Sequence, residues 1–145
     1  MNPLRHAWCW ALARFLRLLA DAHRHFGNLY GSREEYQAAM NNYTRALSLD
    51  PSYAQAYYNR GVLYWREFGD CEPAVQDLTS VLELVPSWAQ AYFNRALAYK
   101  LCGDQERAIR DLERYLQEGT DPFWLEATQK QLAELREGTP VGDGT

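Results

Sequence analysis

The chain has 145 residues, enough for one domain that buries about two thirds of the surface its unfolded form exposes. Hydrophobic residues make up 47% of the composition and charged residues 23%, which excludes a disordered or collagen-like protein. The net charge is −4, and only residues 1–25 are basic, so the charge distribution disfavours nucleic acid as a partner.

The first predicted element is one long amphipathic helix between Pro3 and Gly27, because no helix breaker interrupts this stretch. We expect residues 1–19 to form a basic N-terminal extension that packs on the following helices as a cap. The alternative is a docking helix that lies on a membrane surface or on another subunit, which Trp10 on the otherwise polar face favours. The apolar stripe of this helix recurs at helical spacing and comprises Leu4, Trp8, Leu12, Phe15, Leu19, Ala22 and Phe26.

An internal repeat follows the first helix. Residues 54–61 (AQAYYNRG) match residues 89–96 (AQAYFNRA) at an offset of 35, whereas Gly69 matches Gly103 at an offset of 34. One extra residue therefore lies between Tyr64 and Gly69. An earlier unit has the same glycine and tyrosine spacing. The period of 34 residues with one insertion predicts three units of two helices each, spanning residues 20–53, 54–88 and 89–121.

Capping residues indicate where the helices of these units begin. Ser52 and Ser87 each open a Ser-x-x-Gln sequence and are expected to cap the first helices of the second and third units. Ser32, Asp70 and Asp104 are expected to cap the second helices.

The last predicted element is a helix over residues 122–137, because Asp121 is a good cap and Pro122 suits the first helical position. We expect this helix to cover the last repeat. Residues 138–145, rich in Gly and Thr, are expected to form a disordered tail.

This pattern resembles the tetratricopeptide repeat family, whose Trp-x2-Leu-Gly-x2-Tyr, Ala-x3-Phe and Pro signature has the same period. The resemblance covers about residues 20–122. It implies an all-α fold, an α-solenoid of three helical hairpins with a long N-terminal helix and a C-terminal capping helix. Arg60 and Arg95 depart from the family at a position that is usually leucine, and His23 replaces the first aromatic residue.

No arrangement of residues typical of catalysis is present in the sequence. The histidines are His6, His23 and His25, and none has the spacing of a nucleophile and its base. The glycines match neither the dinucleotide fingerprint nor the P-loop. We therefore predict a non-enzymatic protein without a cofactor or a metal.

The number and spacing of the three cysteines indicate the redox compartment of the protein. Cys9, Cys71 and Cys102 are odd in number and lack Cys-x-x-Cys spacing, which disfavours a disulfide framework and a zinc knuckle. A reducing, cytoplasmic setting is therefore expected. No apolar run reaches the ~20 residues of a membrane span, because Arg14 and Arg17 interrupt the most hydrophobic stretch.

The resemblance also implies that the first helix of each unit lines a concave groove, so we predict a scaffold or adaptor that binds a protein or peptide segment there. The front of this groove is cationic and its remainder is aromatic and aliphatic, so a partner segment with acidic residues and apolar anchors would complement it. The predicted groove residues are Arg17, Arg24, Asn28, Tyr58, Asn59, Val62, Trp65, Arg66, Phe93, Asn94, Leu97 and Lys100.

Some members of the family clamp the terminal carboxylate of chaperones. Arg24, Asn28 and Asn59 match three of the five clamp positions, but Gln90 and Asn94 at the other two carry no charge. A structural hydrogen bond across the groove is therefore the expected role of Asn59 and Asn94.

Two other functions remain open from the sequence. The chain could be an assembly subunit, or a membrane-docked subunit of a larger complex, that uses its N-terminal helix. Helical repeats can also bind single-stranded RNA, which the acidic body of this chain opposes. The sequence leaves the partner and the oligomeric state undetermined.

Overall fold

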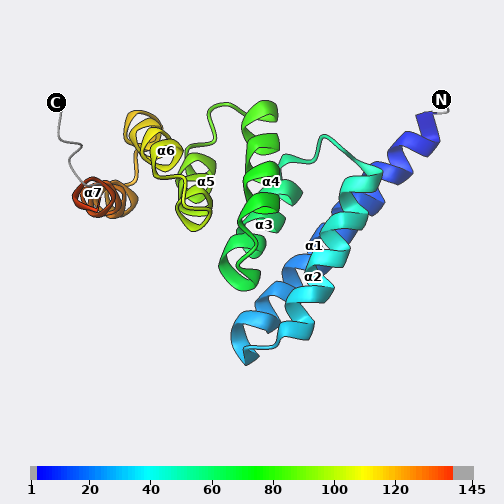
Figure 1. Ribbon diagram of the computed structural model, residues 1–145. Helices are drawn as coiled ribbons and strands as arrows, with labels where there is room; N and C mark the ends of the chain where they lie inside the picture. The colour runs from blue at the N-terminus through cyan, green and yellow to red at the C-terminus, as the bar shows by residue number, and fades with distance from the viewer. Residues whose placement is uncertain (1–2, 139–145) are drawn as a thin grey trace.

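The structure is a computed structural model that describes residues 3–138, and within this range it contains helices and no strand. The helices pair as α1 with α2, α3 with α4 and α5 with α6, and the pairs follow one another in chain order with α7 at the end (Figure 1). The prediction of an all-α solenoid is confirmed. The predicted tail lies outside the described residues except for Gly138. The bounds are α1 (Pro3–Tyr30), α2 (Arg33–Leu49), α3 (Ala54–Leu63), η1 (Tyr64–Phe68), α4 (Cys71–Leu84), α5 (Ala89–Leu101), α6 (Gln105–Glu118) and α7 (Pro122–Glu137).

Helix α1 is continuous over 28 residues, as predicted, but it packs through a different face from the one expected. The expectation that its apolar stripe covers the first repeat was wrong, since Trp8 is 75% exposed and Phe15 is 60% exposed. Small residues at a spacing of seven form the buried face instead and let the backbone of α2 approach closely. The buried residues of α1 are Ala13, Leu16, Ala20 and Gly27.

The single inserted residue of the second unit is accommodated inside a helix. Tyr64–Phe68 forms a π-helical turn, η1, which continues directly from α3. The turn ends at Gly69, whose φ of 69° lies in the left-handed region that favours glycine. The Asp70 N–H donates to the Tyr64 carbonyl over 2.9 Å. The extra residue therefore widens one helical turn and leaves the connection to α4 short.

The two arginines that depart from the family pattern form matching polar clamps between helices. Arg60 donates from Nε and Nη2 to both carboxylate oxygens of Asp77, over 2.7 and 2.8 Å, and from Nη1 to Thr44 over 3.0 Å. Arg95 repeats this arrangement one unit later with Asp111 and Thr79. Because both aspartates are buried, each arginine pairs a carboxylate that would otherwise be isolated in the core.

A disulfide joins Cys71 to Cys102, with a Cα–Cα distance of 5.6 Å. It ties the first residue of α4 to the residue that ends α5, and so links the second unit to the third. The expectation that cysteine count and spacing argue against disulfides was wrong for this pair, because the fold brings together residues 31 apart in sequence. Cys9 is free.

Candidate functional site

The predicted groove runs along the first helix of each pair, α1, α3 and α5, and hydrogen bonds connect these helices in series. Arg17 Nε of α1 donates to the Tyr53 hydroxyl just before α3, over 2.6 Å. Asn59 Nδ2 of α3 donates to Asp21 of α1 over 2.8 Å, and Asn94 Nδ2 of α5 donates to the Tyr58 hydroxyl of α3 over 2.9 Å. The two asparagines thus make bonds across the groove, the role that the sequence favoured over a clamp.

Asp21 is the centre of the polar network at the α1 end of this surface. Its carboxylate accepts hydrogen bonds from Tyr43, Asn59 and Arg17, and Arg24 Nη2 lies 3.9 Å from it. Burial and the bond to this carboxylate both raise the pKa of Tyr43, so its hydroxyl remains a donor. The repeat resemblance places Asp21 at an inward-pointing position of the first unit, although Asp21 is not among the residues predicted to bind a partner.

Two polar atoms of predicted groove residues are shielded from solvent without an acceptor. Arg24 Nε and Trp65 Nε1 donate no hydrogen bond to any atom of residues 3–138. The guanidinium of Arg24 is only weakly engaged by Asp21, at 3.9 Å. A shielded N–H without an acceptor costs free energy, and an external acceptor that is as large as a water oxygen does not reach these two atoms.

The aromatic residues of the groove are more buried than predicted. Tyr58 stacks on Trp88 with ring centroids 5.0 Å apart, and burial raises the pKa of Tyr58. Phe93 is only 7% exposed, because Trp124 of α7 packs edge-on against it at 5.1 Å. Phe93 is therefore mostly buried beneath the capping helix, and it lines a small hollow with Tyr58 and Asn94.

Helix α7 also engages the last predicted cation. Lys100 Nζ donates to Gln131 over 2.9 Å and to Glu134 over 3.4 Å, both on α7. Helix α7 therefore bounds this end of the predicted groove, which is not open along its whole length.

The remaining predicted residues are spread over the surface and the core. Asn28 accepts a hydrogen bond from Tyr36 over 3.0 Å, and exposed Arg66 pairs with its neighbour Glu67 at 3.5 Å. Val62 is half-buried. Leu97 packs against the hydrophobic core formed by α5, α6 and α7. None of these side chains forms an additional polar site.

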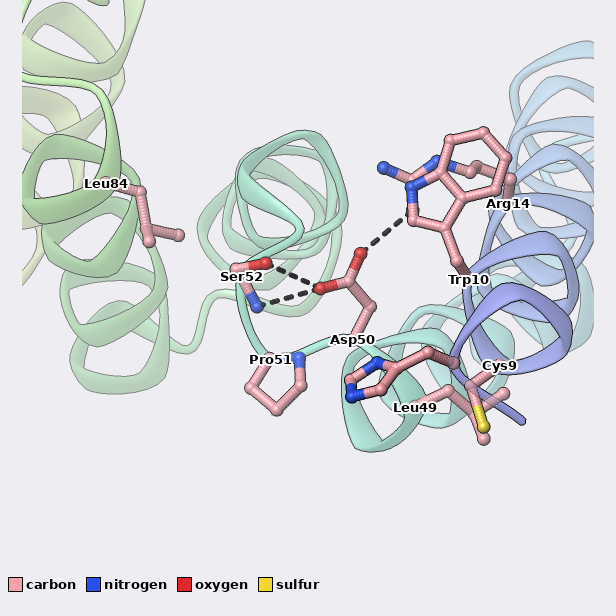
Figure 2. A pocket seen from close by; sticks show the side chains of 9 residues that line it. Cys9, Trp10, Arg14, Leu49, Asp50, Pro51, Ser52 and Leu84 are labelled. Atoms are coloured by element: carbon pink, nitrogen blue, oxygen red, sulfur yellow. Dashed lines mark hydrogen bonds and ion pairs between the residues drawn. The ribbon is translucent and has the colours of Figure 1, made fainter. Parts of the chain in front are cut away.

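A hollow of about 560 Å³ lies between the first half of α1, the connection from α2 to α3 and the end of α4. Figure 2 shows Trp10 and Arg14 on one side, the connection at Asp50 and Ser52 in the middle, and Leu84 of α4 on the other side. The Arg14 guanidinium lies 3.9 Å from the Trp10 ring centroid and donates to Asp50 over 2.8 Å. Trp10 thus has a cation–π partner on the polar face of α1, while much of its ring remains exposed in the hollow.

Residues 3–138 contain no group of three or more His, Cys, Asp or Glu side chains placed to hold a metal ion. None of the helices in this range combines the length and apolar character needed to cross a bilayer.

Comparisons with known proteins agree with the repeat pattern. The family model described as TPR repeat matches residues 27–67, and the one described as Tetratricopeptide repeat matches residues 89–117. No curated protein matches the chain.

Several solved structures share the fold. The TPR domain of OM64 from Arabidopsis is 19% identical, with a TM-score of 0.77, over 90% of this chain and 99% of that one. The first TPR of Spaghetti (RPAP3) bound to the HSP90 peptide SRMEEVD is 25% identical, with a TM-score of 0.68, over 83% and 93%. The N-terminal domain of stress-induced protein-1 from C. elegans is 22% identical, with a TM-score of 0.69, over 94% and 99%.

Proposed function

Since the chain belongs to the tetratricopeptide repeat family, we propose that it is a non-enzymatic protein–protein interaction module that binds a segment of another protein in its concave groove. In this proposal the protein acts as a scaffold or adaptor.

The observation that carries the proposal is the loosely engaged cation of Arg24, whose side chain is 39% exposed and whose Nη2 lies 3.9 Å from Asp21. The sequence assigned Arg24 to the groove. Carbonyl or carboxylate oxygens of a bound segment would accept hydrogen bonds from its guanidinium.

The chemistry of the groove favours a segment with an acidic end and an apolar anchor. An acidic side chain would compete with Asp21 for Arg24, whose contact with Asp21 is long at 3.9 Å. An apolar side chain would fit the hollow between Trp10 and Leu84. A related domain, the first TPR of Spaghetti (RPAP3), binds the acidic HSP90 peptide SRMEEVD.

A more specific proposal is that the groove clamps the terminal carboxylate of a peptide, and the observed contacts disfavour it. Asn59 is already bonded to Asp21, and Asn28 already accepts from Tyr36. We expect SRMEEVD and its amidated form to bind this chain equally, if either binds, in a titration by isothermal calorimetry. A large preference for the free carboxylate would restore the clamp.

The groove is tested by capture of partners from native lysate, identified by mass spectrometry, with matched variants. Arg24→Glu should weaken an acidic partner by at least about tenfold, a free-energy change of about 1.4 kcal/mol. Trp65→Ala should remove an apolar contact. The controls are Arg45→Glu, an exposed arginine of α2, and Phe123→Ala, an exposed aromatic residue of α7. Undiminished capture by both groove variants would contradict the proposal.

The alternatives have their own measurements. Salt-dependent binding to single-stranded RNA would support RNA recognition, and sedimentation with anionic vesicles would support peripheral membrane association. A cytoplasmic location was expected from the cysteines alone, and the Cys71–Cys102 disulfide removes that basis, because disulfides persist in oxidising compartments.

A further inference from the structure

The outward face of α1 carries a continuous apolar stripe that no other part of residues 3–138 covers. Its members are exposed to between 37% and 75% and recur along the helix from its first turns to its last. They are Trp8, Leu12, Phe15, Leu18, Leu19, Phe26, Leu29 and Tyr30. We propose that this stripe is the interface through which two copies of the chain pair. The proposal does not depend on the groove.

From Trp8 onward, the charged residues of α1 lie on its other faces. Arg14 and Arg17 turn toward the groove side, where they contact Asp50 and Tyr53, and His23 contacts Glu35 of α2. From Trp8 to Tyr30 the stripe therefore contains no charged side chain to be desolvated when it is covered. Burial of uncharged apolar surface is favourable, whereas burial of an unpaired charge would oppose association.

The size of the stripe suits a stable interface. Eight large side chains that are each about half exposed present on the order of 800 Å² in total, because aromatic side chains bury roughly 150–250 Å² when fully covered and leucines somewhat less. A typical monomer has a largest apolar patch of roughly 300–600 Å², and a standard interface buries about 800 Å² on each partner. Left open, the stripe would exceed what a monomer ordinarily exposes.

A second copy is the occupant that the charges favour over a lipid surface. A helix that lies on a membrane needs several cations beside its apolar face to meet the headgroups. Arg14 and Arg17 are engaged on the groove side, which leaves Arg5, three residues before Trp8, as the arginine next to the stripe. A uniform apolar stripe is self-complementary under a two-fold axis, which requires the same surface from both partners. Helix α1 belongs to the terminal pair of the stack, so a second copy can approach from outside (Figure 1).

The test is the mass of the full chain in solution, measured by light scattering and sedimentation from micromolar to submillimolar concentration. The expected species has twice the chain mass of 16.8 kDa. Phe15→Glu and, separately, Leu18→Glu should each give a folded monomer, verified by circular dichroism and thermal unfolding. Leu101→Glu is the matched control, because Leu101 is 50% exposed on α5, outside the stripe. It should remain dimeric, as should Arg24→Glu.

Three results would overturn the proposal. One is a wild-type chain that stays at 16.8 kDa over the whole range, and another is a dimer that persists in both stripe variants. The third is binding of monomeric protein to neutral or anionic vesicles that is lost in Phe15→Glu, which would assign the stripe to lipid. Loss of groove binding in Arg24→Glu without loss of the dimer separates this test from that of the groove.

Discussion

At the scale of single residues, Arg60 and Arg95 show how a polar side chain occupies a position that is usually apolar. Each guanidinium binds both oxygens of a buried aspartate on the next helix and a threonine on the preceding one. The side chains of Arg60 and Asp77 are only 16% and 7% exposed, so each charge is stabilised mainly by the other and little by water. Pairing offsets the desolvation free energy of the two charges, and removing one partner leaves the other charge buried and unpaired.

We predict that Arg60→Leu, although it introduces the residue usual in the family, destabilises the chain by about 3 kcal/mol, because Asp77 is left buried and unpaired. The double variant Arg60→Leu, Asp77→Leu should recover most of this loss. The free energy of unfolding is measured by urea denaturation. Arg66→Leu, at an exposed arginine, should change it by less than about 0.5 kcal/mol. A single variant as stable as the wild type would contradict the clamp.

At the scale of elements, the connection between α2 and α3 depends on Asp50. Its carboxylate accepts from Ser52 Oγ over 2.6 Å and from Ser52 N over 3.1 Å, and it pairs with Arg14 of α1. Burial alone would raise the pKa of Asp50, but these hydrogen bonds outweigh it and lower the pKa below the ordinary value of 3.8. One carboxylate thus holds the turn and joins it to α1.

This lowered pKa makes a pH-dependent prediction. The folded state binds the Asp50 proton more weakly than the unfolded state does, so ionised Asp50 stabilises the fold above pH 3.8, and this is lost as pH falls through the lower folded value. Asp50→Asn should cost about 1 to 2 kcal/mol at neutral pH. Its difference from wild type in urea denaturation should shrink on acidification. Asp70→Asn, at a cap whose side chain makes no capping hydrogen bond, should show no such convergence.

Element boundaries were more predictable than the contacts that the elements make. Ser32, Asp104 and Asp121 cap α2, α6 and α7 as predicted, because these bonds are local. The predicted caps Ser52 and Ser87 were wrong, since α3 and α5 begin after aromatic residues without a side-chain cap.

Faces and long-range pairs were the least predictable features. The period of α1 predicts a helix, but it does not tell which face packs, because a row of small residues can pack more closely than a row of large ones. The cover of α7 over Phe93 and the approach of Cys71 to Cys102 both depend on how the helix pairs stack. The helical period of a single segment carries no such information.

At the scale of the whole molecule, most contacts join neighbouring helices, as expected for a solenoid. The Cys71–Cys102 disulfide adds a covalent link between two of the stacked units. It closes a loop between residues 31 apart, and such a loop restricts the unfolded chain.

We predict that Cys71→Ser, Cys102→Ser lowers the free energy of unfolding by about 3 to 4 kcal/mol, the loop entropy expected for this spacing. A reducing agent should give the same loss in wild type and no loss in the variant. Cys9→Ser should leave stability unchanged, because this thiol is free. Thiol titration of denatured, unreduced protein should find one reactive sulfur per chain, and a count of three would contradict the link.

The wide turn η1 shows how this architecture absorbs a change in chain length. An added residue in a regular α-helix rotates everything after it by about 100°. Here Tyr64–Phe68 takes up that rotation locally, and α4 still pairs with α3 as α6 pairs with α5. An insertion of this kind can therefore re-aim a side chain such as Trp65 on the inner surface while the spacing of the neighbouring units stays constant.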